Sequence, residues 1–174
     1  MLQNYSRYRV LQEFFDYPRN NFQMREISRR VKLSQPSVIN HLTALRKEGL
    51  ILREKKGLYP TYRADRESED FRLLKKQNMV LRIHRSGLLA YVEDKTRPNC
   101  IILFGSASRG EDSEESDIDI FIQAGEANLD FQKYEKSLKR RINPIFEPDI
   151  KELSKELLNN IINGQVLYGY LKVF

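Results

Sequence analysis

The sequence predicts an α+β protein with two domains, a small helical domain ending in a strand hairpin and a C-terminal mixed β-sheet with flanking helices. Three observations support this fold class. Apolar residues recur at helical spacing through most of residues 1–97. Two short apolar runs, residues 100–104 and 118–122, are bounded by turn residues, as strands are. The charge is also divided, because residues 1–66 contain 14 Lys and Arg against 6 Asp and Glu, whereas residues 67–174 contain 16 against 18.

The composition is that of a folded protein in water. The 174 residues are 40% hydrophobic and 31% charged, which is enough apolar material for real cores. No apolar run approaches the roughly 20 residues that span a bilayer. The N-terminal segment MLQNYSRYRV has no apolar signal-peptide core, so we expect a cytoplasmic protein. Cys100 lies in an apolar run and is expected to be a buried small hydrophobe.

The first 65 residues predict a domain with the order helix, helix, turn, helix, hairpin. The expected helices run from Tyr5 to Phe15, from Met24 to Val31 and from Ser34 to Glu48. Ser34 is a good N-cap for the third helix, and Pro36 fits its first turn. The expected strands run from Leu50 to Arg53 and from Leu58 to Arg63, with a basic turn between them.

This pattern, with the segment REISRRVKLSQPSVINHLTALRKEGLI followed by a basic wing, resembles the winged helix-turn-helix regulators of bacteria and archaea. The resemblance implies that the third helix enters the major groove of double-stranded DNA. The helix residues that would then face DNA are Gln35, Ser37, Asn40, His41 and Arg46. The wing residues that would bind phosphates are Arg53, Lys55 and Lys56. The net charge of +8 on residues 1–66 independently indicates a polyanionic partner.

Two features of this first part remain open. The polar face of the third helix could be solvated only, in which case the domain would mediate protein contacts. Residues 66–97 predict a connecting helix that is buried on more than one side and weakened at Ser86-Gly87. Such a helix could serve a dimer interface, and we expect a homodimer because two DNA half-sites raise the effective affinity.

The C-terminal domain is organised around residues 100–123, CIILFGSASRGEDSEESDIDIFIQ. Gly105 lets the backbone leave the first strand sharply, and Ser106 with the following N–H groups can hold phosphate oxygens. Arg109 is available for anionic oxygens. Asp117 and Asp119 share one face of the second strand, where two carboxylates repel each other. A divalent cation such as Mg²⁺ is therefore expected between them.

The order strand, GSASRG, acidic turn and SDIDIFI closely resembles the minimal nucleotidyltransferase family of the DNA polymerase beta superfamily. That family places G-S before D-x-D, and ten residues separate Ser106 from Asp117 here. The resemblance implies a nucleotidyltransferase-like fold for residues 98–174 and transfer of NMP from an Mg²⁺-bound NTP, with ATP expected, to a protein or nucleic-acid acceptor. Asp117 and Asp119 would be metal ligands and catalytic residues, whereas Gly105, Ser106 and Arg109 would bind the nucleotide.

The segments after the motif predict a helix beginning at Asn128 or Asp130, an edge strand and a final helix. The strand, Ile142–Glu147, contains Pro144, which favours a sheet edge. The final helix is expected from Lys151 to Asn163, with the preceding Asp149 as an N-cap or first-turn acid.

The edge strand carries the main departure from the family pattern. Active relatives place a third carboxylate on this strand, and Asn143 takes that position here. Glu147 is in phase with Asn143 but lies roughly 13 Å further along an extended strand. Three interpretations follow: an enzyme tethered to DNA, a non-catalytic regulator that senses a nucleotide or binds a partner, or an inherited fold with two solvated aspartates.

Overall fold

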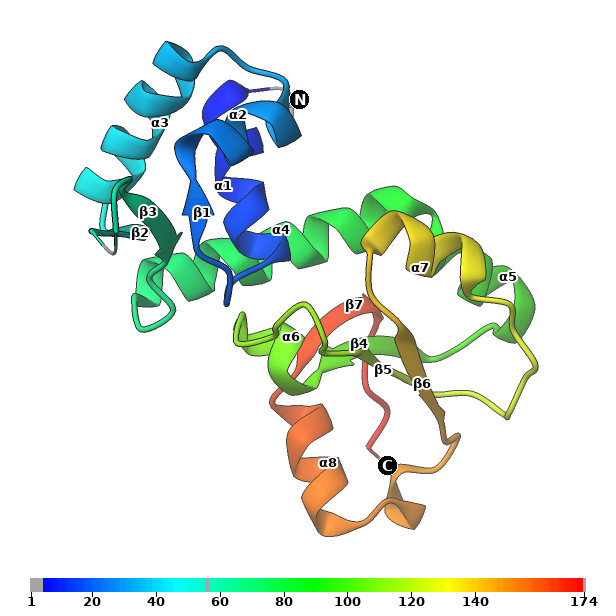
Figure 1. Ribbon diagram of the computed structural model, residues 1–174. Helices are drawn as coiled ribbons and strands as arrows, with labels where there is room; N and C mark the ends of the chain where they lie inside the picture. Colours follow the sequence, from blue (N-terminus) through cyan, green and yellow to red (C-terminus); the bar gives the residue numbers. More distant parts are fainter. Residues whose placement is uncertain (1–4, 56, 174) are drawn as a thin grey trace. The chain divides into compact units, whose positions relative to one another are not determined.

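The computed structural model describes residues 5–55 and 57–173 and confirms the α+β fold class (Figure 1). The chain divides into two compact units between Leu73 and Leu74, within helix α4 (Glu69–Ser86). Each unit has its own hydrophobic core. In the part of the chain that the structure describes, no helix is long and apolar enough to cross a membrane.

Before α4, the described residues of the first unit form three helices and a small antiparallel sheet in the order β1-β3-β2. Its elements before α4 are α1 (Ser6–Asp16), β1 (Phe22–Gln23), α2 (Met24–Val31), α3 (Gln35–Lys47), β2 (Ile51–Glu54) and β3 (Thr61–Ala64). The predicted helices are confirmed to within one residue at each end. The strand β1 was not predicted, and β3 begins later than expected because Leu58 and Tyr59 are exposed at the hairpin tip.

The core of the first unit comes from the apolar faces of these helices. Phe14 of α1 packs edge-to-face on Phe22, with ring centroids 5.5 Å apart. In α3, the buried residues Val38, Leu42 and Leu45 recur at helical spacing, so the polar residues between them face outward. Ser34 occupies the predicted N-cap position of α3, although its side chain accepts no capping hydrogen bond.

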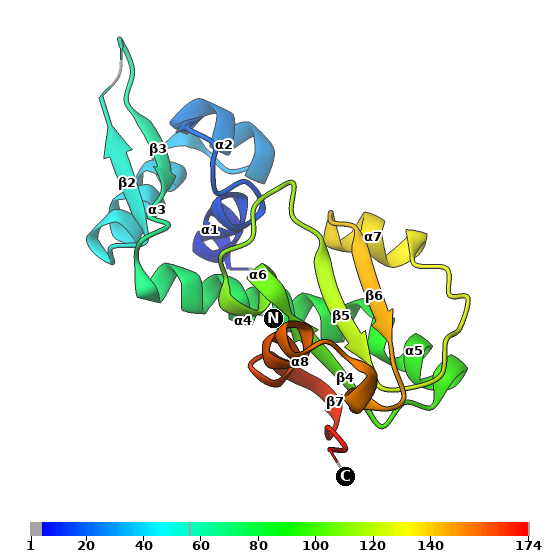
Figure 2. The ribbon, with the colours of Figure 1, turned by 90° about the horizontal axis from the view of Figure 1, so that it is seen from below.

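The second unit is built on a four-stranded mixed sheet in the order β6-β5-β4-β7 (Figure 2). Its elements after α4 are α5 (Leu88–Thr96), β4 (Cys100–Phe104), α6 (Gly105–Arg109), β5 (Ile118–Ile122), α7 (Gln132–Leu138), β6 (Ile142–Phe146), the 3₁₀ turn η2 (Ile150–Glu152), α8 (Lys155–Ile162) and β7 (Gln165–Gly169). β5 runs parallel to β6, whereas β4 is antiparallel to both β5 and β7. β6 is an edge strand, as Pro144 predicted.

Three features of this unit differ in detail from the sequence prediction. Gly87, at φ 82°, divides the connecting helix into α4 and α5 at the predicted weak point. The predicted final helix is wrong over its first turn, because Ser154 caps α8 by accepting a hydrogen bond from Leu157 N–H at 3.2 Å. The terminal segment forms β7, which was not predicted as a strand.

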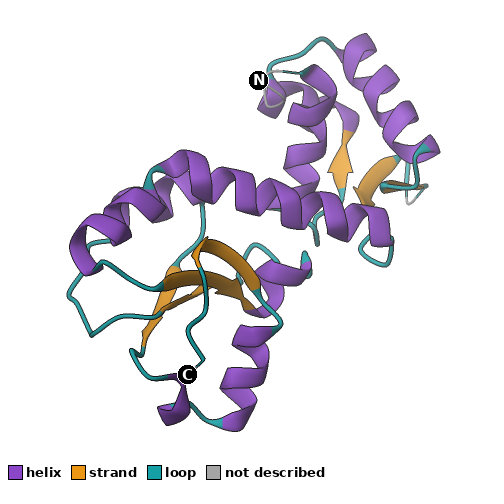
Figure 3. Cartoon of the chain, turned by 180° about the vertical axis from the view of Figure 1, so that it is seen from behind, coloured by secondary structure: helices purple, strands orange, loops and turns teal. Residues whose placement is uncertain are grey.

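The sheet separates two apolar clusters. Figure 3 shows helices on both faces of this sheet. Ile101 and Leu103 of β4 pack with residues of α4, α5 and α7, whereas Ile102 packs on the opposite face with residues of α8. β5 alternates in the same way, because Ile120 joins the first cluster and Phe121 the second. The alternation therefore places Asp119 on the α8 face of the sheet.

Candidate functional site

Three adjacent strands bring Gly105, Asp119 and Asn143 together at one end of the sheet. Phe104, the last residue of β4, pairs with Asp119 of β5, and Asp119 pairs with Asn143 of β6. Gly105 follows directly after β4. Residues that are distant in sequence therefore form one row, with Asp119 at its centre.

Gly105 makes room for the Asp119 carboxylate. Its φ is +70°, in the left-handed region that favours glycine. A Cβ at this position would lie only 2.4 Å from Asp119 Oδ2. The bare Cα of Gly105 is thus required both by the turn out of β4 and by the close approach of Asp119.

Asn143 contacts the other oxygen of the same carboxylate. Its side-chain Nδ2 donates a hydrogen bond to Asp119 Oδ1 at 2.9 Å. The position therefore holds a hydrogen-bond donor that fixes Asp119 rather than a third negative charge. The prediction that Asn143 lies in this strand, beside the aspartates, is confirmed by the register of β5 and β6.

Asp117 lies just before β5 and is exposed, whereas Asp119 is half-buried. The loop that leads to Asp117 is held by a buried ionic contact, because Lys75 Nζ donates to both the side-chain Oδ1 and the backbone oxygen of Asp112. Arg140 Nε lies 4.0 Å from Asp112 Oδ2, and all three side chains are at most 4% exposed. This cluster anchors the loop between α6 and β5.

Sequence reasoning missed the anchoring cluster. A signal for Lys75 was present, because it is four residues after Phe71 and three before Asn78, which places it on the apolar side of the connecting helix. Asp112 gave no comparable signal, since it stands among five acidic residues in the motif loop. Only the fold distinguishes the buried acid from its exposed neighbours.

The residues predicted to hold phosphates, Gly105, Ser106 and Arg109, lie within the short helix α6. Ser106 is half-buried in the first turn of α6, and Ser108 Oγ donates to Gly105 O at 2.8 Å. Arg109 is exposed and pairs with Glu111, with Arg109 Nε 2.7 Å from Glu111 Oε2. A surface ion pair of this kind contributes only about 0–1 kcal/mol, so the Arg109 guanidinium can exchange it for a phosphate group.

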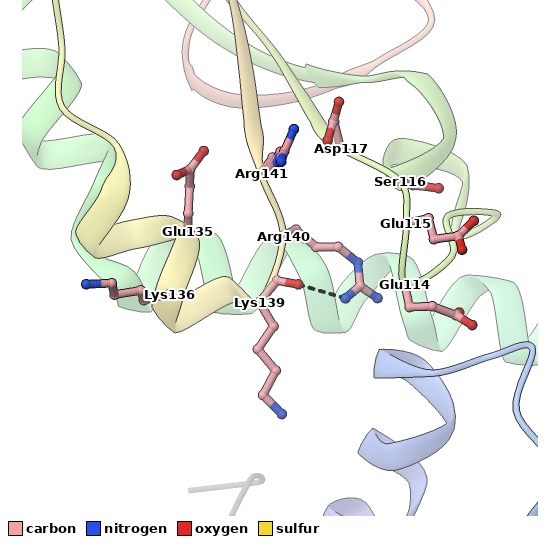
Figure 4. A pocket seen from close by; sticks show the side chains of 9 residues that line it. All are labelled: Glu114, Glu115, Ser116, Asp117, Glu135, Lys136, Lys139, Arg140 and Arg141. Carbon is pink, nitrogen blue, oxygen red and sulfur yellow. Dashed lines mark hydrogen bonds between the residues drawn. The ribbon is translucent and has the colours of Figure 1, made fainter.

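A pocket of about 570 Å³ opens beside Asp117 (Figure 4). One wall is the end of the motif loop, and the other is α7 with the turn that leads into β6. Its lining residues are Glu114, Glu115, Ser116, Asp117, Glu135, Lys136, Lys139, Arg140 and Arg141. None of the predicted phosphate-binding residues lines it.

The donor set at the end of β5 fits one divalent cation. Asp117 and Asp119 supply carboxylate oxygens, the ligands that Mg²⁺ prefers together with water and phosphate oxygens. No group of three or more His, Cys, Asp and Glu that could hold a metal occurs within residues 5–55 and 57–173. The residues fit a cation held by two carboxylates and completed by nucleotide phosphates and water, rather than an all-protein metal cage.

The helix α3 carries the predicted DNA-facing residues on its outward side. Gln35, Asn40 and Arg46 are exposed, and Ser37 and His41 are half-buried. Ser37 Oγ lies 3.3 Å from His41 Nε2, so these two side chains fix each other. Burial and then the nearby Arg7 charge lower the pKa of His41, which keeps its imidazole neutral at pH 7.

The predicted wing residues Arg53 and Lys55 are both exposed on the hairpin, and Lys56 lies outside the described residues. Between α3 and the wing there is a pocket of about 330 Å³ whose lining includes Thr43 and Arg46 of α3 and Arg53 of β2. Cations from two elements thus line one concave surface of this unit, as phosphate contacts require.

Cys100 is fully buried in β4, as predicted. Burial raises the pKa of its thiol to about 11. The thiol stays protonated at physiological pH and is a packing residue rather than a nucleophile.

The fold and the site define the class of each unit: a winged helix-turn-helix with a small antiparallel sheet, and a nucleotidyltransferase-like sheet with the G-S and D-x-D residues at one end. Comparison with known proteins agrees. Residues 87–171 match the family described as "Polymerase beta, Nucleotidyltransferase". Residues 7–52 match the family described as "Bacterial regulatory protein, arsR family". The chain therefore joins a helix-turn-helix DNA-binding domain to a nucleotidyltransferase domain of the polymerase beta type.

One curated relative comes from Methanocaldococcus jannaschii and is named "Putative protein adenylyltransferase". It is 45% identical to this chain over 56 residues, which are 32% of this chain. The chain spans about half of that relative, since the match covers 52% of its length. No solved structure matches the chain.

Proposed function

We propose that this protein is a DNA-binding transcriptional regulator whose nucleotidyltransferase domain binds Mg²⁺-NTP, with ATP as the nucleotide, and transfers NMP to an acceptor hydroxyl. The observation that carries the proposal is the row Gly105–Asp119–Asn143. A Cβ at position 105 would lie 2.4 Å from Asp119 Oδ2, so the packing of Asp119 requires glycine there. An aspartate at a merely solvated strand end would have no such requirement. The name of the M. jannaschii relative favours a protein acceptor.

In the proposed reaction, the oxygen of the acceptor hydroxyl attacks the α-phosphorus of the NTP. The bond from that phosphorus to the bridging oxygen of the β-phosphate breaks, and pyrophosphate leaves with the electron pair. The hydroxyl proton passes to water, because Asn143 has no basic atom at the third position. Arg109 leaves its ion pair with Glu111 and binds the phosphates of the NTP, and Ser106 contacts the phosphate oxygens. Bound Mg²⁺ would offset the negative charge on the phosphate oxygens.

The metal-binding role belongs to Asp117 and Asp119. Asp119 reaches the site already oriented, since Gly105 packs on one of its oxygens and Asn143 donates to the other. Asp117 is free to turn toward the metal because it is exposed at the end of an anchored loop. One fixed ligand and one mobile ligand suit a cation that arrives together with the nucleotide.

The DNA-binding half of the proposal assigns α3 to the major groove and the wing to phosphates. Exposed Gln35 and Asn40 can pair with adenine edges, and Arg46 can pair with guanine. We propose a homodimer that binds two half-sites about one helical turn apart. Selection from a pool of random duplexes tests this half: recovery of one shared sequence is expected, and no enrichment at low or physiological salt would refute it.

A second function is favoured by one observation, the hydrogen bond from Asn143 to Asp119. A site without a third carboxylate binds nucleotide better than it activates an acceptor. In this alternative the domain senses ATP or binds a partner without turnover, and the protein acts only as a regulator.

Transfer of label separates the two functions. The full chain is incubated with Mg²⁺, α-labelled NTPs and a lysate of the source cells as acceptor, beside an Asp119→Ala control. Covalent label that appears only with the wild type supports transfer. If the wild type binds Mg²⁺-ATP yet labels nothing that the Asp119→Ala control does not, the enzymatic half is wrong and the sensing function stands.

A further inference from the structure

The pocket beside Asp117 has no role in the nucleotide site described above. It touches that site only through Asp117, which stands at the junction of its two walls (Figure 4). Gly105, Ser106 and Arg109 do not line it. The pocket is therefore a separate compartment that shares one metal-ligating residue with the phosphate site.

The strand order places this compartment across β5 from the residues assigned to the phosphates. β5, which carries Asp119, lies between β4 and β6. The phosphate-binding residues follow β4, whereas the pocket lies where α7 leads into β6. In an in-line displacement the attacking oxygen approaches opposite the leaving pyrophosphate. The proposed function assigns the phosphates to the residues after β4, which would hold the pyrophosphate on that side, so the attacking hydroxyl would come from the pocket.

Two cations in the pocket are available to a ligand. Lys136 and Arg141 are exposed, and neither side chain has a hydrogen bond or ion pair within the described parts of the chain. Two other charged residues of the pocket already have partners, since Glu135 Oε1 accepts from Ile142 N–H at 3.0 Å and Arg140 donates to Lys139 O at 2.9 Å.

Arg141 is the better placed of the two cations. Its backbone oxygen accepts a hydrogen bond from Ile118 N–H at 2.8 Å, so it lies across from the residue between the two aspartates. Strand alternation puts Arg141 on the same face as Asn143. Figure 4 shows the Arg141 and Asp117 side chains next to each other at one end of the pocket. A ligand group bound by Arg141 would therefore sit close to the metal site.

The lining excludes several ligand classes. It contains no aromatic residue, so it offers no stacking surface for a nucleobase. A phosphodiester chain is charged at every unit and would meet Glu114 and Glu115 on the loop wall. A peptide can instead place a few carboxylates on the other wall, beside Lys136 and Arg141. The unit as a whole does not attract a polyanion, because residues 74–174 contain 15 Lys and Arg and 15 Asp and Glu. A peptide with a few carboxylates fits this lining better than a nucleic acid does.

We propose that this pocket is the acceptor site and that it takes an acidic segment of a protein. Lys136 and Arg141 pair with carboxylates that flank the accepting hydroxyl, and Arg141 can do so with two parallel hydrogen bonds. This proposal rests on the proposed nucleotidyltransferase function and names its substrate class. Lys136 and Arg141 are specificity residues that act on binding of the acceptor.

Peptide binding tests the proposal. Three fluorescent peptides of one length carry a central Tyr flanked by Glu, by Gln or by Lys, and anisotropy is measured with the full chain, Mg²⁺ and an ATP analogue that cannot be cleaved at the α–β bond. We expect the Glu peptide to bind at least about tenfold more tightly than the Lys peptide at low salt. Arg141→Glu and Lys136→Glu should each weaken the Glu peptide and strengthen the Lys peptide. A reversed order of the peptide affinities shows that these side chains recognise the peptide charge, because an unfolded variant would lose binding to all three peptides.

The matched control is Lys155→Glu, which reverses an exposed lysine in the first turn of α8, outside the pocket. It should change none of the three affinities. The proposal would be overturned if the three peptides bound equally, or if neither pocket variant changed the affinity for the Glu peptide. It would also be overturned if a single-stranded oligonucleotide competed more strongly than the Glu peptide. Calorimetry with Mg²⁺-ATP separates failure of this inference from failure of the proposed function. If the protein binds the nucleotide but binds the three peptides equally, only the acceptor-site inference is wrong. If it binds no nucleotide, both are wrong.

Discussion

The side-chain amide of Asn143 donates a hydrogen bond to Asp119 Oδ1 at 2.9 Å, across the parallel strands β6 and β5. The pair occupies the end of the sheet at which the family pattern expects two carboxylates to face each other. An amide here removes the repulsion between two carboxylates and orients Asp119 before any cation binds. The same exchange removes a metal ligand and a proton acceptor, so it favours nucleotide binding over turnover.

Replacing Asn143 with Asp should make the unit more dependent on a divalent cation. Without metal, the variant loses a hydrogen bond and gains a like-charge contact, which together cost about 1–2 kcal/mol. With Mg²⁺ the added carboxylate becomes a ligand, so the cation should restore the stability. Thermal unfolding with EDTA and with Mg²⁺ measures the difference, and the Tm shift caused by Mg²⁺ should be larger than in the wild type.

Asn143→Ala is the matched control for this prediction, because it removes the hydrogen bond without adding a charge. Its Tm should fall slightly and respond to Mg²⁺ as the wild type does. An Asn143→Asp variant that is as stable as the wild type in EDTA would show that the hydrogen bond and the repulsion have no energetic weight.

Gly105→Ala should destroy the nucleotide site. The new Cβ would lie 2.4 Å from Asp119 Oδ2, and the backbone φ of +70° is itself unfavourable for alanine. Displacement of Asp119 together with backbone strain should cost about 1–3 kcal/mol. Gly125→Ala is the control, since a Cβ there meets nothing within 4 Å. Circular dichroism and nucleotide titration of both variants check the prediction, and full binding by Gly105→Ala would contradict it.

Lys75→Ala should destabilise the second unit strongly, although Lys75 does not line the pocket. The substitution leaves the buried Asp112 carboxylate without its ammonium partner, a loss of about 3–5 kcal/mol. The double variant Lys75→Met with Asp112→Leu removes the pair but leaves the buried Arg140 without the carboxylate 4.0 Å from its Nε, so it should recover only part of that loss. Urea unfolding of the two variants measures it. A double variant no more stable than Lys75→Ala would show that the ion pair itself is needed.

DNA binding should separate base contacts from phosphate contacts. Arg46→Ala should weaken binding to a selected duplex by about 1–3 kcal/mol and relax its sequence preference. Lys55→Ala should weaken all duplexes alike and reduce the salt slope by about 1. Arg66→Ala replaces an exposed cation after β3 and should change neither. Anisotropy at several salt concentrations makes the comparison, and identical effects of Arg46→Ala and Lys55→Ala would contradict the assigned roles.

Much of this architecture could be predicted from the sequence because its signals are local. The helical spacing of apolar residues predicted α1 to α3. The turn residues on either side of the two apolar runs predicted β4 and β5. The Asn143 position could be predicted because the family resemblance places a third functional side chain on the strand that follows D-x-D. The strand β7 could not be predicted, since its pairing with β4 joins residues more than 60 positions apart.

The rest of the candidate site depends on tertiary contacts that leave no local pattern. Asp112 looks like its acidic neighbours until the fold buries it against Lys75. The pocket lining combines α7, the motif loop and the turn that leads into β6, and no spacing rule joins these three segments. Only part of the role of Gly105 could be predicted from the sequence. The sharp turn after β4 was expected, but the close approach of Asp119 to Gly105 depends on the register between β4 and β5.

Isothermal titration with Mg²⁺-ATP tests the central claim, that the Gly105–Asp119–Asn143 row is a working nucleotide site. The wild type should bind one nucleotide per chain with a Kd of about 1 μM to 1 mM, and only when Mg²⁺ is present. Asp119→Ala should weaken binding at least about tenfold, whereas Asp94→Ala, an exposed aspartate of α5, should bind as the wild type does. Absence of heat with the wild type, or equal heats from the wild type and Asp119→Ala, would contradict the account.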